Sequence, residues 1–263
     1  MSAPNQFQPP PPPQAPAPTG PTMSTGETLT SILFEPGRVF ESLRERPRFL
    51  VALVISMIFY MAFTITFYQK VGHERVVRET IESSPFTAQQ TPEQKEASIR
   101  AQSSPIVKWI TIAAGPVFIA IFFAAGAALY LLGALLMGKQ VSYKQALAIW
   151  SYSSMPPLVL SMIVNVILVF LKSPDDYDIV SASRRGLVRA NLSFLSDSKA
   201  APILYTLLGS LDIFAFYGLV LAALGLRKVA KMSSGSAWGI VATIWIIGVL
   251  VRLAFAIFSG QGM

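Results

Sequence analysis

The sequence predicts an all-α protein, a polytopic membrane bundle of five transmembrane helices. Of its 263 residues, 52% are hydrophobic and only 13% are charged, whereas an ordinary soluble domain has about 25% charged residues. The mean hydropathy is +0.52. Five apolar segments also reach the ~20 residues that cross a hydrocarbon core. Composition and segment length together therefore indicate a lipid bilayer as the solvent of most of this chain.

The first 22 residues are expected to form a disordered, Pro-rich tail. They hold nine of the 19 prolines and no charged residue, so they cannot bury a core and favour polyproline II conformation. The alternative is a ligand for an SH3-type domain. Because the basic residue that usually flanks such ligands is absent, we favour a solvated linker. The tail also lacks the basic and apolar regions of a signal peptide.

Residues 23–48 are expected to form two short amphipathic helices at the membrane surface. Apolar residues recur at helical spacing, and Pro36-Gly37 separates the two helices. The arginines at the polar positions are expected to face anionic headgroups; they are Arg38, Arg44, Arg46 and Arg48. The alternative is a helical cap that packs on the ends of the spans.

Five predicted spans make up the helical domain at 49–258. They cover residues 49–68, 109–137, 145–171, 203–226 and 237–258. Proline removes a helical hydrogen bond, so the prolines inside the second and third spans predict kinks at Pro116, Pro156 and Pro157.

The distribution of basic residues predicts the orientation. Segments 138–144 and 227–236 hold five Lys/Arg and no acidic residue, whereas segments 69–108 and 172–202 mix eleven Lys/Arg with nine Asp/Glu. The positive-inside rule places the N-terminus and both short loops in the cytoplasm, and the C-terminus outside with its short tail at 259–263. The interfacial basic residues of the second short loop are Arg227, Lys228 and Lys231.

The outside loop at 69–108 is predicted to be a helical hairpin. Thr91, Pro92 and Gln94 form a capping-box pattern that starts a helix. The preceding stretch, KVGHERVVRETIES, also has helical character. His73 lies in this charged stretch, and we expect it to be solvated.

No motif in the sequence supports an enzyme. The chain has no cysteine and one histidine, which excludes thiolate metal sites and an HExxH zinc helix. Glycine-rich nucleotide-binding motifs and a GxSxG motif are absent as well. We therefore expect no catalytic residue, no cofactor and no metal. Because the basic residues lie beside apolar spans, they indicate lipid headgroups and not nucleic acid as partners.

Three polar residues inside the spans form the candidate site. Asp212 lies ten residues into the fourth span, whereas Asn165 and Arg252 lie six residues before the ends of the third and fifth spans. At 1.5 Å per residue these positions are roughly 14 Å and 9 Å from the same outer side. A lone charge there costs about 2.5–3.5 kcal/mol, so we predict an Asp212–Arg252 ion pair with Asn165 nearby. In the alternative, Arg252 reaches the interface and Asp212 is neutral.

Three stretches resemble the YIP family, the Ypt/Rab-interacting integral membrane proteins, in its bacterial branch. They are SILFEPGRVFESL, GKQVSYKQALAIWSYSSMPPLVL and LDIFAFYGLVLAALGLRKVAKMSSGSAW, and the resemblance covers about residues 29–258. It implies a five-span bundle with a cytoplasmic N-terminal segment, multi-pass in the bacterial cytoplasmic membrane. It also implies that Asp212, in the LDxF stretch, belongs to the design of the bundle itself.

The resemblance does not carry Rab binding to this chain. Eukaryotic members bind prenylated Rab GTPases, but this chain has a short Pro-rich tail where they have a longer acidic segment. We predict a scaffold or adaptor that organises membrane components, with the bilayer, other membrane proteins or a second copy as partners. The alternative is a small transporter, channel or lipid-moving protein that uses Asp212 as the coupling group. Transporters usually offer broken helices around a midplane cavity, and the sequence shows little sign of them.

Overall fold

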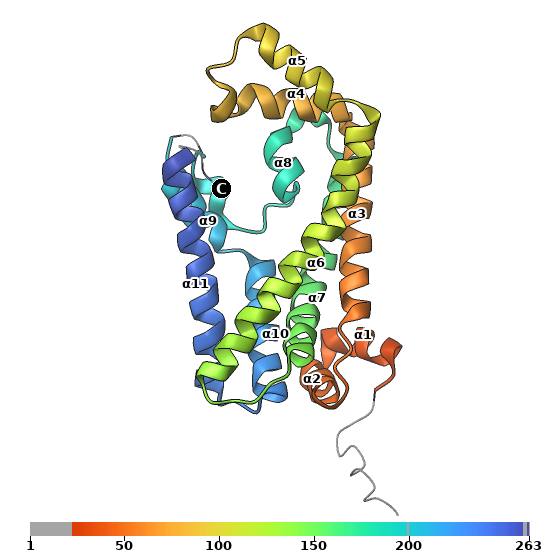
Figure 1. Cartoon of the computed structure of the whole chain (residues 1–263), viewed down its shortest axis with the longest axis vertical. Helices are drawn as coiled ribbons and strands as arrows, with labels where there is room; N and C mark the ends of the chain where they lie inside the picture. The colour runs from red at the N-terminus through yellow and green to blue at the C-terminus, as the bar shows by residue number, and fades with distance from the viewer. Residues whose placement is uncertain (1–22, 199, 260–261, 263) are drawn as a thin grey trace, which may run out of the picture.

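The structure is a computed structural model that describes residues 23–198, 200–259 and 262. The predicted tail at 1–22 lies outside the described residues. Within these residues the chain is helical, with one isolated β-bridge and no strand, which confirms the all-α class. α1 (Thr25–Phe34) and α2 (Pro36–Glu45) lie at one end of the bundle, which we call the basal end. α4 (His73–Ser83) and α5 (Pro92–Gln102) lie at the opposite, distal end (Figure 1).

Four helices are long and apolar enough to cross a membrane. They are α3 (Leu50–Val71), α6 (Pro105–Leu136), α7 (Tyr143–Leu171) and α11 (Ser234–Ser259). Only 22–28% of their most apolar windows is buried inside the protein. Such helices expose apolar surface on the outside of the bundle, which is the arrangement that a lipid solvent requires. The chain is therefore a multi-pass membrane protein.

The prediction of one continuous span at 203–226 is wrong. The structure has two helices there, α9 (Pro202–Ser210) and α10 (Ile213–Val229), joined at Leu211 and Asp212. The break has a local cause: Asp212 adopts extended backbone angles and its side chain accepts a hydrogen bond from the amide of Ala215, as an N-cap does. Neither α9 nor α10 alone is long enough to count as a membrane span. Four single helices, and not five, are therefore long and apolar enough to cross a membrane among the described residues.

α7 is the central helix of the bundle and packs against α3, α6 and α10. Gly126 lets α6 approach closely, because a Cβ there would lie 2.1 Å from the ring of Trp150 on α7. α6 and α7 both continue through their internal prolines. The kinks at Pro116, Pro156 and Pro157 stay a prediction.

The basal helices pack on the spans. α2 contacts α10 and α7, and Val39, Phe40 and Leu43 on its apolar face are buried. Burying a large apolar side chain stabilises a fold by about 1.5–3 kcal/mol. The apolar face of α2 therefore does not enter lipid headgroups, and the structure supports the alternative of a helical cap.

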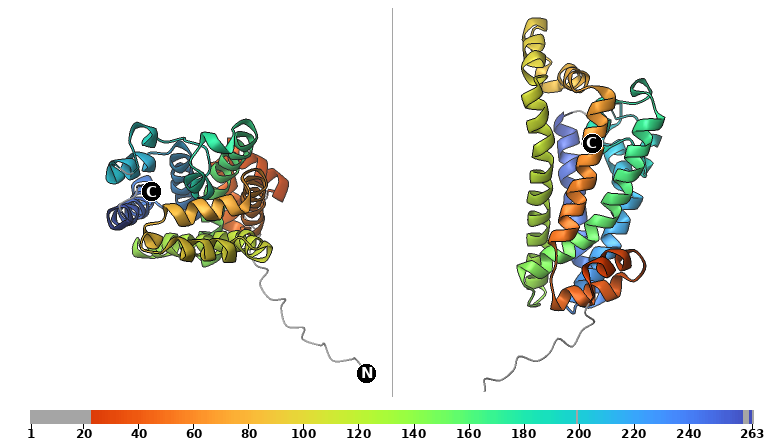
Figure 2. Two further views of the ribbon diagram at one scale, coloured as in Figure 1. Left: turned by 90° about the horizontal axis from the view of Figure 1, so that it is seen from above. Right: turned by 90° about the vertical axis from the view of Figure 1, so that its right-hand side faces the viewer.

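The predicted hairpin at the distal end is present. The capping box of Thr91 and Gln94 starts α5, and α4 packs beside α5. Seen from above, α4 lies across the end of the bundle (Figure 2). An ion pair of 3.0 Å joins Arg78 Nη1 on α4 to Glu96 Oε2 on α5.

His73 is buried, so the prediction of a solvated histidine is wrong. It begins α4 directly after Gly72, its ring packs against that of Tyr68, and its Nε2 lies 3.0 Å from the carbonyl oxygen of Gln102. A ring nitrogen that meets a carbonyl oxygen acts as the donor. Nδ1 is buried without a partner among the described residues. The histidine thus connects the start of α4 to the end of α5.

Candidate functional site

Asp212 begins α10 at the break between α9 and α10. Its Oδ1 accepts a hydrogen bond of 3.0 Å from the amide of Ala215, and its Oδ2 accepts one of 3.3 Å from Nδ2 of Asn191. Both carboxylate oxygens therefore have donors from the chain itself. A negative group at this position also interacts favourably with the positive end of the α10 dipole.

The backbone at the break pairs with a segment that precedes α9. The amide of Ile213 donates to the carbonyl oxygen of Ala190 at 3.0 Å, and Asn191 and Asp212 form an isolated antiparallel β-bridge. Unpaired backbone groups are costly away from water. The segment thus satisfies groups that the interrupted helix leaves open.

Asn165 on α7 holds the other end of the same segment. Its side chain is 0% exposed. Oδ1 accepts hydrogen bonds from the amides of Leu187 at 2.5 Å and Val188 at 2.9 Å, while Nδ2 donates to the carbonyl oxygen of Ser161 at 2.9 Å. The buried amide is therefore used on both its donor and its acceptor side.

Gly186 allows this contact to form. Its φ is +83°, and a Cβ there would lie 2.5 Å from Oδ1 of Asn165. Any other residue would combine an unfavourable backbone conformation with a clash against a buried polar atom. We call residues 186–191 the clamped segment, since Asn165 holds its start and Asp212 holds its end.

The predicted ion pair between Asp212 and Arg252 is not formed. Nε of Arg252 donates to the carbonyl oxygen of its own helix at Gly248, at 3.4 Å. Asn165 and Asp212 do belong to one assembly, but the clamped segment joins them.

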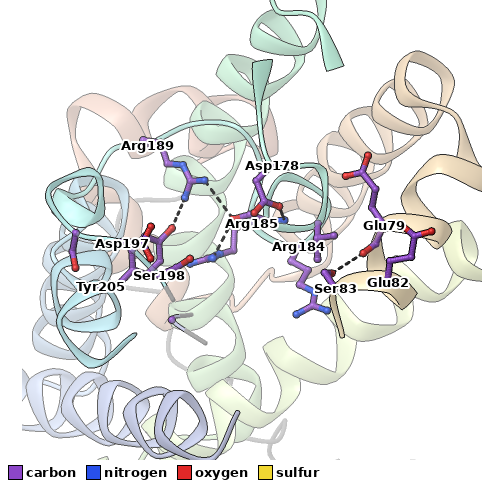
Figure 3. A pocket seen from close by; sticks show the side chains of 14 residues that line it. Glu79, Glu82, Ser83, Asp178, Arg184, Arg185, Arg189, Asp197, Ser198 and Tyr205 are labelled. Atoms are coloured by element: carbon purple, nitrogen blue, oxygen red, sulfur yellow. Dashed lines mark hydrogen bonds between the residues drawn. The ribbon is translucent and has the colours of Figure 1, made fainter. Parts of the chain in front are cut away.

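The clamped segment also carries Arg189 into a polar pocket of about 620 Å³ at the distal end, where Arg184 and Arg185 precede it. α8 (Ile179–Arg185), the clamped segment, α9 and the end of α4 form its walls. Nη1 of Arg189 donates to Oη of Tyr205 at 2.9 Å, and Arg185 lies 5.4 Å from the centre of the same ring. Figure 3 shows Arg189 and Tyr205 on one side of this pocket and the glutamates of α4 on the other. We call it the arginine pocket.

A second, smaller pocket of about 320 Å³ lies among α6, α7 and α10. Trp150, Pro157 and Gly218 are among the residues that line it. Its walls are mostly apolar side chains, and Nε1 of Trp150 is buried without a partner among the described residues. It lies along the spans, where the surrounding solvent is lipid.

Most of the predicted interfacial basic residues at the basal end have partners in the protein. Arg38 pairs with Glu27 at 3.5 Å and Glu35 at 3.4 Å, and Arg44 pairs with Glu45 at 3.0 Å. Arg48 donates to Thr25, and Lys228 of α10 pairs with Glu41 of α2 at 2.5 Å. The basic residues at this end that are exposed and make no ion pair with a described residue include Arg46, Arg227 and Lys231.

Sequence reasoning missed the residues that complete the site. Gly186, Asn191 and the pocket arginines lie in what the sequence presents as an outside loop. One signal was available: Asp212 directly before Ile213 matches the N-cap pattern of a helix start. A helix that starts in the middle of an apolar run requires something to pair with the open backbone, and this directs attention to the preceding loop.

The comparisons with known proteins give one match. The family model of the Yip1 domain matches residues 30–255. This range includes the basal helices from Thr30 onward, every residue of the clamped segment and most of α11. No curated protein and no solved structure matches the chain.

Proposed function

The chain belongs to the Yip1 domain family, and on that premise we propose that it is a non-enzymatic scaffold or adaptor that organises other components of its membrane. Its polar intramembrane groups act as structure, and its basal end makes the contacts with partners. We place it in the cytoplasmic membrane of a bacterium, in keeping with the bacterial branch of the family that the sequence resembles.

The proposed topology has five crossings. α9 and α10 follow each other from the distal towards the basal end (Figure 1). Together they have 26 residues, which at 1.5 Å per residue is about 39 Å, enough for one crossing. The short basic loops then lie with α1 and α2 in the cytoplasm, and the C-terminus lies outside.

The docked basal helices are the observation that supports an adaptor most directly. α2 is fixed to α10 by its buried apolar face and by the Glu41–Lys228 ion pair. A fixed surface loses little conformational entropy when a partner binds. Exposed basic residues border this surface, namely Arg46, Arg227 and Lys231, and we call them the basal basic residues.

A transporter that uses Asp212 for coupling is the second candidate, and the break in the fourth span is its motivation. Discontinuous helices in transporters point their open ends at substrate or ions. Here the end of α10 is capped by Asp212, and the carboxylate accepts from Ala215 and Asn191. The site is thus occupied by the chain itself, which favours the structural role.

Site-specific photo-crosslinking in native membranes tests the proposal. A crosslinking residue in place of Arg46 at the basal end is expected to give one discrete adduct with another membrane component. The same residue in place of Arg100, which is exposed on α5 at the distal end, is the matched control. Adducts of the same kind from both positions, or a lone monomer from Arg46, would contradict the adaptor.

A flux assay separates the two candidates. Proteoliposomes with the wild-type chain are expected to leak ions and lipids no faster than empty vesicles. Flux that requires the protein and disappears in Asp212→Asn would establish the transporter instead. This substitution removes the charge and retains an oxygen that can cap α10.

A further inference from the structure

The arginine pocket is a polar cavity that the proposed function does not use. The pocket lies where α9 begins, near the ends of α4 and α8. Gly262, just beyond α11, also lines it. If the long helices span the bilayer, the pocket lies at the level of the lipid headgroups on the distal side. Groups that carry phosphate are concentrated at this level.

The inner wall of the pocket carries an excess of positive charge. Arg184, Arg185 and Arg189 belong to α8 and the clamped segment, and the acidic residues of the same wall are Asp178 and Asp197. Both aspartates are engaged by backbone amides: Asp178 Oδ1 accepts from Ser181 at 2.8 Å and Asp197 Oδ1 accepts from Ala200 at 2.7 Å.

The glutamates on the α4 wall have arginine partners on their own helix. Glu79 pairs with Arg75 at 3.0 Å, and Glu82 lies 3.9 Å from Arg78. Their negative charge is only partly compensated there, because Arg75 also pairs with Asp175 and Arg78 also pairs with Glu74 and Glu96. The positive charge that a ligand can meet comes from the arginines of the inner wall, on the side of the pocket away from these glutamates.

Two of the arginines are held in place by neutral groups. Nη2 of Arg185 donates to Oγ of Ser181 at 3.1 Å, and Nη2 of Arg189 donates to the same oxygen at 3.3 Å. Tyr205 contacts both side chains. The phenol and the hydroxyl position the guanidinium groups without neutralising them, and a planar guanidinium in a fixed orientation suits two oxygens of a phosphate.

Arg184 is the third arginine and has no ion pair with a described residue. It is exposed, and Figure 3 shows it between the α4 wall and the side of Arg189. A guanidinium without a partner beside two oriented ones is the arrangement found where an anionic group binds. The backbone that carries the cluster is fixed as well, because Asn165 anchors Leu187 and Val188 between Arg185 and Arg189.

We propose that the arginine pocket binds a phosphate group, through Arg184, Arg185 and Arg189, at the distal membrane surface. The phosphate belongs either to the headgroup of a phospholipid or to a soluble phosphate, and the pocket volume of about 620 Å³ accommodates both. The proposal is independent of the adaptor function, since it concerns the opposite end of the bundle.

Thermal unfolding of the full chain in dodecyl maltoside tests the proposal with three probes. Dioleoylphosphatidylglycerol has a phosphodiester, dioleoylglycerol has the same acyl chains without it, and inorganic phosphate has no acyl chains. We expect the unfolding temperature to rise in a saturable way with the phospholipid and not with dioleoylglycerol. A rise with inorganic phosphate alone at millimolar concentration would identify a soluble phosphate as the ligand. Equal rises with both lipids and none with phosphate would overturn the proposal.

Variants locate the effect. Arg184→Gln removes a side chain that makes no contact required by the fold, and with Arg189→Lys it should weaken phosphate binding about tenfold, as expected for the loss of charge-assisted hydrogen bonds. Lys keeps the charge of residue 189 but not the planar fork. The matched control is Lys172→Gln with Arg100→Gln, two exposed basic residues of the distal end outside the pocket. Binding unchanged in the pocket variant, or weakened equally in the control, would overturn the proposal.

Discussion

Individual residues in this protein show what polar groups do inside an apolar bundle. Asn165 and Asp212 lie at comparable depth in their segments, yet each binds the clamped segment and neither contacts the other. A buried amide or carboxylate is costly unless its hydrogen bonds are satisfied. Here the chain supplies the donors and acceptors itself, so the polar residues fix the path of a loop through the bundle.

Asn165→Ala is expected to destabilise the protein by about 2 kcal/mol or more, because it leaves the amides of Leu187 and Val188 without their acceptor. The measurement is the free energy of unfolding in mild detergent. Ser161→Ala is the control: its hydroxyl contributes only a 3.4 Å contact to Asn165, so its effect should stay within about 0.5 kcal/mol. Equal stability of Asn165→Ala and wild type would show that the clamp does not hold the segment.

Asp212 gives a prediction that depends on the role of its oxygens. Asp212→Asn keeps an acceptor for the amide of Ala215 but loses the acceptor for Asn191, so it should cost less stability than Asp212→Ala, which loses both and should cost about 1 kcal/mol or more. Unfolding of both variants is compared under the same conditions. If Asp212→Asn were as unstable as Asp212→Ala, the negative charge and not the cap would be the important feature.

At the scale of elements, the basal helices are stabilised mainly by apolar burial. Phe40 is 0% exposed, and Glu41–Lys228 is a partly exposed ion pair. Truncation of a buried phenylalanine costs about 3–5 kcal/mol, whereas such an ion pair contributes about 0–1 kcal/mol.

Phe40→Ala should therefore release α2 from α10, and Glu41→Gln should not. Limited proteolysis at the basal end reports the release, since a detached helix becomes a substrate. Phe34→Ala is the control, because Phe34 on α1 is 83% exposed. Protection of α2 in Phe40→Ala equal to that in the control would contradict the docking.

The distal hairpin should respond to pH. The guanidinium of Arg78 lowers the pKa of Glu96 on α5. A carboxyl group whose pKa is lower in the folded than in the unfolded state stabilises the fold at pH values above its unfolded pKa, about 4.3. That contribution is lost as the pH falls through the lowered folded pKa.

Hydrogen exchange of the α4–α5 hairpin at pH 6 and pH 3 measures this effect, after correction for the intrinsic pH dependence of exchange. Protection should fall more in the wild type than in Glu96→Gln, which has no charge to lose at this position. An identical pH dependence in both would contradict the role of the Arg78–Glu96 pair.

For the whole molecule, the sequence was sufficient for the class and for most elements. Length and apolarity located four spans, Pro36 and Thr91 located helix starts, and the residues of the resemblance led to the family. The sequence could not reveal the clamped segment, because its contacts join residues far apart in the chain. Leu187 is 22 residues from Asn165 on α7, and Asn191 is 21 residues from Asp212 at the start of α10. Apolarity alone also hides a break, since Leu211 and Ile213 look the same in one helix or two.

The number of crossings can be tested with single cysteines, because the chain has none of its own. Lys172→Cys lies after α7 and Gly235→Cys lies at the start of α11, on the two sides of the α9–α10 pair. We expect a membrane-impermeant thiol reagent to label Lys172→Cys from outside intact cells and to label Gly235→Cys only after the membrane is opened. Labelling of both from the same side would show that α9 and α10 do not cross.

Asp212 acts as a structural partner of the clamped segment, and a double-mutant cycle with Asn191 tests this role most directly. The free energy of unfolding in mild detergent is measured for wild type, Asn191→Ala, Asp212→Ala and the double variant. We expect a coupling energy of about 1 kcal/mol, since each single variant leaves the other side chain without its partner. Additive effects, with Asp212→Ala as stable as wild type, would contradict the account and would make transport through this break the better explanation.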